Sequence, residues 1–142
     1  MISKLNSTSL SGIDGYIVNV ETDISSGLPG FDIVGLPDAA VKESKERIRA
    51  AIKNTGLTMP SKKITVNLAP ADVKKEGAHF DLPIALGILS ASGHFSVRDE
   101  GEYAFLGELS LDGSVRPVRG ALPMVISASE QGIVDIILPE GN

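Results

Sequence analysis

One segment, residues 67–89 (NLAPADVKKEGAHFDLPIALGIL), constrains the fold of this chain more than any other. Residues 64–68, which lead into it, alternate between apolar and polar side chains and predict a half-buried strand. After a charged loop, Asp81 is placed to cap a helix that tolerates Pro83 in its first turn. The helix is almost entirely apolar or small until Gly93 closes it, and a helix that is apolar all round is buried. The segment therefore predicts a strand and a helix at the centre of one core.

The remaining segments predict further strands and helices around this centre. The expected strands are residues 2–10, 16–20, 31–35, 64–68, 103–109, a return strand after Asp112-Gly113, and 134–138, and the expected helices run from Asp38 to Gly56, from Asp81 to Gly93 and over 121–131. Asp112-Gly113 predicts a hairpin with a type I′ turn, which needs positive φ at both central residues. In the first helix, Glu43 and Arg47 form a favourable pair four residues apart. The order β-β-β-α-β-α-β-β-α-β predicts a single α+β domain over residues 1–142.

Composition narrows the classes of protein to which the chain can belong. The 142 residues are 42% apolar and 22% charged, which is ordinary for one globular domain with its own core. The net charge of −5 argues against wholesale binding to nucleic acid or an anionic membrane, but is compatible with a local basic patch. Cysteine is absent, which excludes disulfides, thiolate zinc ligands and a cysteine nucleophile. No apolar run approaches the ~20 residues that span a bilayer and no signal peptide is evident, so we expect a cytoplasmic protein.

Long motifs carry a resemblance to known proteins. Residues 67–89 and residues 107–120 (GELSLDGSVRPVRG) resemble the two catalytic segments of Lon-type protease domains, which implies the two-layer α+β fold that those domains share with one ribosomal-protein domain. A closer resemblance covers almost the whole chain. Residues 9–56 (SLSGIDGYIVNVETDISSGLPGFDIVGLPDAAVKESKERIRAAIKNTG), 64–89 and 105–123 are similar to the N-terminal domain of the ComM/YifB family of magnesium-chelatase-like ATPases.

This resemblance implies a longer protein, in which an AAA+ ATPase module follows residue 142. Members of the family are thought to form homo-oligomeric rings that use ATP and magnesium to drive DNA branch migration during natural transformation. The expected partners of this domain are therefore its own AAA+ module and, through the whole protein, DNA. The chain itself contains no GxxxxGK[ST] motif to cradle phosphates, so we expect no cofactor in this domain.

The resemblance to Lon-type domains also bears on proteolysis, because such a site needs a serine nucleophile and a lysine base. Residues 74–77 (KKEG) match the loop before the nucleophile, and His79 stands where the serine would be. Residues 115–120 (VRPVRG) match the second motif, and Leu122 stands where the lysine would be. An isobutyl side chain cannot activate an imidazole, so we expect a non-catalytic domain. A peptidase with an atypical nucleophile is the alternative.

His79, Asp81 and Glu76 lie close together in the sequence but do not predict a metal site. Metal sites usually require three or more converging ligands, and helix capping accounts for Asp81. The second histidine, His94, lies near a helix end. His79 is expected either to be a solvated or locally hydrogen-bonded loop residue or to line a residual groove and contact a partner.

Basic residues give a third hypothesis, a nucleic-acid-binding module. Lys42, Lys45, Arg49 and Lys53 are expected on the exposed side of the first helix, and Lys62, Lys63, Lys74 and Lys75 flank the central strand. If they share a face, they could neutralise phosphates in a salt-dependent way. The candidate partner or DNA contacts are Lys62, Lys63, Lys74, Lys75 and His79. Interleaved glutamates favour an ordinary solvated surface instead, and aromatic residues for base stacking are scarce.

Overall fold

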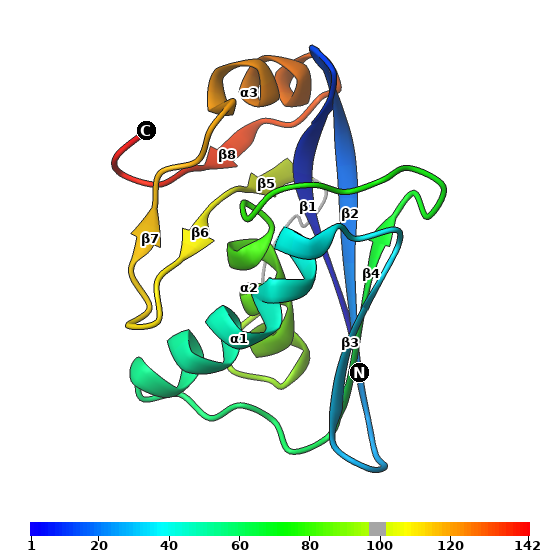
Figure 1. Ribbon diagram of the computed structural model, residues 1–142, viewed down its shortest axis with the longest axis vertical. Coiled ribbons are helices and arrows are strands. Elements are labelled where there is room, and N and C mark those ends of the chain that lie inside the picture. Colours follow the sequence, from blue (N-terminus) through cyan, green and yellow to red (C-terminus); the bar gives the residue numbers. More distant parts are fainter. Residues whose placement is uncertain (97–101) are drawn as a thin grey trace.

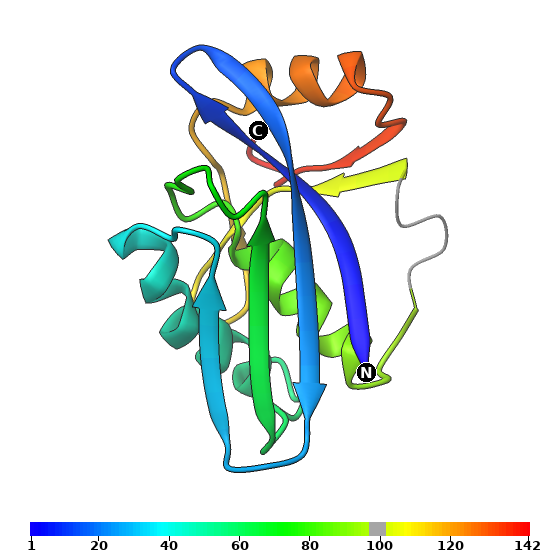
Figure 2. The ribbon, with the colours of Figure 1, turned by 90° about the vertical axis from the view of Figure 1, so that its right-hand side faces the viewer.

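The computed structural model describes residues 1–96 and 102–142. Six strands form the main sheet in the order β3-β4-β2-β1-β5-β8, and a two-stranded sheet, β6-β7, lies beside it (Figures 1 and 2). The strands are β1 (Ile2–Ser11), β2 (Asp14–Ser25), β3 (Gly30–Val34), β4 (Lys63–Ala69), β5 (Tyr103–Phe105), β6 (Glu108–Leu109), β7 (Val115–Arg116) and β8 (Asp135–Ile137). The helices are α1 (Ala39–Asn54), α2 (Asp81–Ala91) and α3 (Ala121–Glu130).

Strand alternation sets which side of the main sheet is covered. The β1–β2 hairpin and the β2–β4 pair are antiparallel, whereas the pairs β3–β4, β1–β5 and β5–β8 are parallel. Successive strand side chains point to opposite faces, so every second residue of β2 and β4 enters the core. The buried apolar residues of these two strands are Val18, Val20, Ile24, Ile64, Val66 and Leu68.

Helices α1 and α2 lie on the same side of the sheet and complete the two layers (Figure 2). Ile48 and Ile52 of α1 and Ile84 and Ile88 of α2 join the strand residues in one apolar cluster. Helix α3 packs against β1 and β2 near the hairpin, where a smaller cluster contains Ala104, Ala128 and Ile133 (Figure 1). This arrangement confirms the predicted mixed α+β fold. Among the helices described, none combines the length and the apolar run that crossing a bilayer would need.

The ends of α1 follow the sequence prediction. Asp38 is the N-cap, and its carboxylate accepts a hydrogen bond of 2.8 Å from the Val41 N–H. This bond satisfies one of the amides that a helix start leaves without a partner. The helix ends at Thr55 and Gly56, and Gly56 has the positive φ (+84°) that glycine adopts without strain. The predicted Glu43–Arg47 ion pair is present at 3.8 Å.

The prediction that Asp81 caps α2 is wrong. Asp81 is the first residue of the helix, the N-cap position belongs to Phe80, and no side chain caps the helix there. The Asp81 carboxylate points away from its own helix start and binds residues of α1 and β6. Long-range partners therefore replaced the local one.

The predicted strand over 103–109 is interrupted at Leu106 and Gly107. The Leu106 N–H bonds to Ile137 in the main sheet, whereas the Gly107 N–H bonds to the His79 carbonyl and the Gly107 carbonyl accepts from Leu82. A Cβ atom at Gly107 would lie 2.6 Å from Val115 and 3.2 Å from Leu82. Glycine therefore lets the chain pass close to the start of α2 as it leaves one sheet for the other.

The hairpin after β6 is confirmed, but its turn is not type I′. Gly113 has φ of +93°, whereas Asp112 is not among the residues with positive φ. The Gly113 N–H donates to the Ser110 carbonyl, and the Ser110 N–H donates to the Ser114 carbonyl. This is the pattern of a type I turn followed by a left-handed glycine. The Asp112 carboxylate stabilises it by accepting bonds from the Ser114 N–H and hydroxyl, at 3.0 and 2.6 Å.

Candidate functional site

The loop between β4 and α2 is held in place by a buried lysine. Lys75 has no exposed surface, and its ammonium donates to the carbonyls of Gly35, at 2.9 Å, and Pro70. Its backbone joins the same segment, because Lys75 N–H donates to Leu36 and Lys75 carbonyl accepts from Asp38. Burial lowers the pKa of Lys75. Lys75 therefore fixes the loop against the start of α1.

His79, the residue expected at the nucleophile position, has a ring that makes a hydrogen bond to the backbone of β1. Its exposed fraction is only 7%, and its Nε2 lies 3.0 Å from the Thr8 carbonyl oxygen. A carbonyl can only accept, so Nε2 carries the proton and Nδ1 holds a lone pair. Burial lowers the pKa of His79 to about 4, so the imidazole is neutral near pH 7. Gly77 lies close to the His79 ring, because a Cβ atom at residue 77 would be 2.9 Å from Nδ1.

Two neighbouring hollows, of about 360 and 380 Å³, share the residues Gly77, His79 and Arg119. The first extends towards Glu108 and Pro117, and the second towards β1 and the start of α1. Together they form a residual groove, as the sequence allowed for His79. Within the residues described, Arg119 takes part in no ion pair.

The second position of the expected dyad carries no base. Leu122 lies in the first turn of α3 and is 71% exposed. The hydroxyl of Ser9, which lines the second hollow, interacts with the phenol of Tyr16, and that phenol donates to the Lys74 carbonyl at 3.2 Å. Burial, the largest cause, raises the pKa of Tyr16. Among the described residues that line it, the groove thus offers a neutral imidazole and an arginine, but no lysine to activate a nucleophile.

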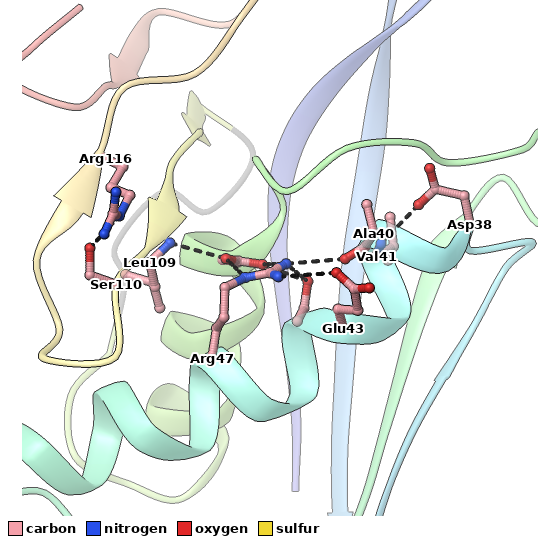
Figure 3. A network of polar contacts seen from close by, with 10 residues as sticks. Asp38, Ala40, Val41, Glu43, Arg47, Leu109, Ser110 and Arg116 are labelled. Atoms are coloured by element: carbon pink, nitrogen blue, oxygen red, sulfur yellow. Dashed lines mark hydrogen bonds and ion pairs between the residues drawn. The ribbon is translucent and has the colours of Figure 1, made fainter.

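The buried carboxylate of Asp81 joins α1, α2 and β6, and Figure 3 shows two of its partners, Arg47 and Leu109. Asp81 accepts hydrogen bonds from Ser44 Oγ at 2.5 Å, from Arg47 Nε at 2.6 Å and Nη2 at 3.0 Å, and from the Leu109 N–H at 3.0 Å. Arg47 also donates to the Ala40 carbonyl at 3.1 Å, as Figure 3 shows. The hydrogen bond to Asp81 raises the pKa of Arg47. The network ties α1, α2 and β6 together through Asp81, which follows shortly after His79 in the chain.

The five predicted contact residues do not share one surface. Lys62 and Lys63 are exposed at the start of β4, whereas Lys74 is exposed beyond its end and pairs with Glu76 at 3.6 Å. The seven residues of β4 separate the two ends by about 20 Å. Lys75 and His79 are buried, a position that does not suit contact with a partner except where His79 lines the groove.

The described histidine and carboxylate side chains do not form a metal-binding cluster. In the described ranges, no group of three or more His, Asp or Glu side chains is arranged to hold a metal ion. His94, exposed after α2, bonds instead to the Ser92 hydroxyl through its Nδ1 at 3.0 Å.

Comparison with known proteins identifies relatives over nearly the whole chain. A family model described as subunit ChlI of Mg-chelatase matches residues 20–142. An uncharacterized protein of Mycobacterium tuberculosis is 46% identical over 141 residues, which are 99% of this chain and 28% of the relative. The YifB protein of Escherichia coli is 44% identical over 131 residues (92% and 26%), and the competence protein ComM of Haemophilus influenzae is 45% identical over 119 residues (84% and 23%).

A more distant likeness is to the Lon protease of Mycolicibacterium smegmatis, which is 24% identical over 139 residues, 94% of this chain and 18% of that protein. The chain spans about a quarter of the length of its nearer relatives.

Proposed function

The chain belongs to the family described as subunit ChlI of Mg-chelatase, which it shares with ComM and YifB, and on this basis we propose that it is the non-catalytic, Lon-like module of a ComM-type AAA+ ATPase. In this proposal the module serves in assembly and docking. Hydrolysis of ATP with magnesium takes place in another part of the whole protein, because these residues contain no phosphate-binding GxxxxGK[ST] motif. The whole protein forms a cytoplasmic ring that drives branch migration of DNA.

One observation carries the non-catalytic assignment. His79 donates through Nε2 to the Thr8 carbonyl, and Leu122, which the resemblance to Lon-type domains puts at the position of the base, is exposed. Covalent catalysis requires a nucleophile within hydrogen-bond reach of a base that a third group orients. The described residues that line the groove include no such pair, which supports a retained scaffold.

Exposed apolar side chains support the assembly role. Leu122 and Ile126 of α3 are 71% and 50% exposed, and Val134 and Ile137 lie exposed in and before β8. Helix α3 and β8 lie at the same end of the molecule (Figure 1). Contiguous exposed apolar patches mark interaction surfaces, and Leu122 and Ile126, four residues apart, lie on one face of α3. We assign this surface to contact with the protein's own AAA+ module.

A peptidase assay tests the non-catalytic assignment. The purified protein is incubated with an unfolded protein and with fluorogenic peptides, beside a Lon protease as positive control. We expect no turnover. Turnover that is abolished by His79→Ala would overturn the proposal in favour of the peptidase with an atypical nucleophile.

The assembly role is tested on the whole protein by light scattering and by ATP hydrolysis. Leu122→Asp/Ile126→Asp is expected to weaken ring formation. The matched control is Ile13→Asp, which adds a charge at the exposed tip of the β1–β2 hairpin (91% exposed). Unchanged assembly in the double variant would show that α3 does not make the contact.

A further inference from the structure

Helix α1 carries a line of cations that the groove does not use. Lys42, Lys45, Arg49 and Lys53 recur every three or four residues, so they lie on one side of the helix. Arg47 lies off this line and turns towards Asp81. We name the four residues the α1 stripe.

The α1 stripe leads into a small basic hollow beside β3 and β4. Arg49 and Lys62 line this hollow, of about 250 Å³, together with Gly30 and Ser61. The Arg49 guanidinium lies 5.5 Å from the centre of the Phe31 ring, a cation–π distance that orients it. The Gly30 N–H donates to the Lys62 carbonyl at 3.3 Å and so fixes the opposite wall. Helix and loop therefore bring two cations, 13 residues apart in the chain, to one concave site.

These cations are free to take an anionic ligand. None of the four stripe residues, nor Lys62 or Lys63, forms an ion pair within the described ranges, and the hollow has no acidic lining residue. Glu46 is the carboxylate that lies along the stripe, between Lys42 and Arg49. The chain as a whole carries −5, so this surface is a local positive region on an acidic protein.

The length of the α1 stripe and the lack of an exposed aromatic ring at the hollow indicate which class of anion fits this surface. Lys42 to Lys53 spans about 16 Å at the rise of an α-helix, which corresponds to about five nucleotides along one strand of duplex DNA. Single-strand binders usually add stacking on exposed aromatic rings. The ring at this site, Phe31, is only 5% exposed and cannot stack on a base.

We propose that the α1 stripe and the Arg49–Lys62 hollow form a docking surface for the phosphate backbone of duplex DNA, read without regard to base sequence. This inference deepens the proposed function, since it names the part of the module that would contact DNA. It also replaces the two-ended set of predicted contacts with a surface that keeps Lys62 and leaves out Lys63 and the loop lysines.

The test measures binding of a short fluorescent DNA duplex by anisotropy at about 50 and about 200 mM salt. Arg49→Glu/Lys62→Glu is expected to weaken binding about tenfold or more and to reduce the slope of log affinity against log salt by about two. Lys4→Glu/Arg116→Glu changes the net charge equally on other surfaces and should retain most of the affinity. Glu46→Lys should tighten binding, which no merely destabilised variant would do.

Three outcomes would overturn the inference. The first is an equal loss in the control pair, and the second is absence of any effect of Glu46→Lys. The third is binding of poly-glutamate as tight as that of a duplex of the same charge, which would assign the surface to an acidic protein. ATP hydrolysis and ring formation are measured separately in the whole protein, so their persistence in the Arg49/Lys62 variant would leave the proposed function intact even if DNA binding is unchanged.

Discussion

The His79 imidazole donates its Nε2 proton to the Thr8 carbonyl across 71 residues of sequence, at 3.0 Å. The bond joins the loop before α2 to β1 and places the ring at the edge of the groove. Because a carbonyl stabilises the protonated Nε2 whether the ring is neutral or charged, this contact alone does not hold the ring neutral. Burial does so, and it outweighs the nearby Asp81 and Asp38 carboxylates.

The first prediction concerns stability in acid. The pKa of His79 is about 4 in the folded protein against 6.5 for the free side chain, so the unfolded chain binds the proton more readily. Stability from this group is therefore present above pH 6.5 and is lost as the pH falls towards 4, by about 3 kcal/mol. We expect the free energy of unfolding of the wild type, measured in urea, to fall relative to that of His79→Gln as the pH decreases over this range. The glutamine amide can also donate to Thr8 but does not titrate. His94→Gln, at the exposed histidine, is the control. Parallel curves for wild type and His79→Gln would contradict the prediction.

The second prediction concerns the Asp81 network. Asp81→Ala removes the carboxylate that holds the Arg47 guanidinium, whose side chain is only 19% exposed, and leaves the Leu109 N–H without its acceptor. Losing one member of such a pair costs about 3–5 kcal/mol. Glu43→Gln, which removes the 72% exposed partner of the same arginine at 3.8 Å, should cost less than about 1 kcal/mol. Chemical denaturation of both variants measures the two costs. Similar values would show that the buried carboxylate contributes no more than the surface one.

The third prediction contrasts two adjacent lysines. Lys75→Met leaves the carbonyls of Gly35 and Pro70 without their donor and should destabilise the fold by about 1–3 kcal/mol. Lys74→Met, at an exposed position whose side chain pairs with Glu76, should change stability by less than about 0.5 kcal/mol. Because burial lowers the pKa of Lys75, the wild type should also gain stability as the pH rises towards 10.5, and Lys75→Met should lose that gain. Thermal melts at neutral and alkaline pH test both points. A Lys75→Met protein as stable as Lys74→Met would show that the buried Lys75 ammonium is not needed to hold the loop.

The contrast between Lys74 and Lys75 shows how far the sequence predicts the site. Lys74 and Lys75 are the same residue type side by side, yet one is exposed and the other fully buried. The burial of Lys75 depends on the Gly35 carbonyl, 40 residues earlier in the chain. Likewise, Asp81 has the local pattern of a helix cap, but its partners Ser44 and Arg47 are 37 and 34 residues away. Local patterns name the residue types at a site and leave their partners undetermined.

The fold is easier to predict from the sequence than the site, because strands and helices produce periodic patterns of apolar residues. Residues 64–68 alternate with period two since one face of β4 is buried, and the apolarity of α2 follows from burial of most of its circumference. The break in the predicted strand 103–109 depends instead on backbone bonds to His79 and Leu82. A glycine within a strand pattern often marks a close backbone approach, so Gly107 was the available signal for that break.

The last prediction separates two costs of replacing a glycine. Gly35 has φ of +104°, and a Cβ there would lie 2.3 Å from the Leu68 carbonyl oxygen, which is backbone and cannot move aside cheaply. Gly27 also has positive φ, +142°, but a Cβ there meets nothing within 4 Å. Gly27→Ala therefore bears only the conformational cost, of about 1–2 kcal/mol. Gly35→Ala adds a steric cost of about 1–3 kcal/mol and displaces β3 from the loop that Lys75 holds. Denaturant unfolding should place Gly35→Ala clearly below Gly27→Ala in stability. Equal stability of the two variants would mean that β3 can shift without penalty, and that the close approach of Gly35 to β4 is not required for the position of the loop before His79.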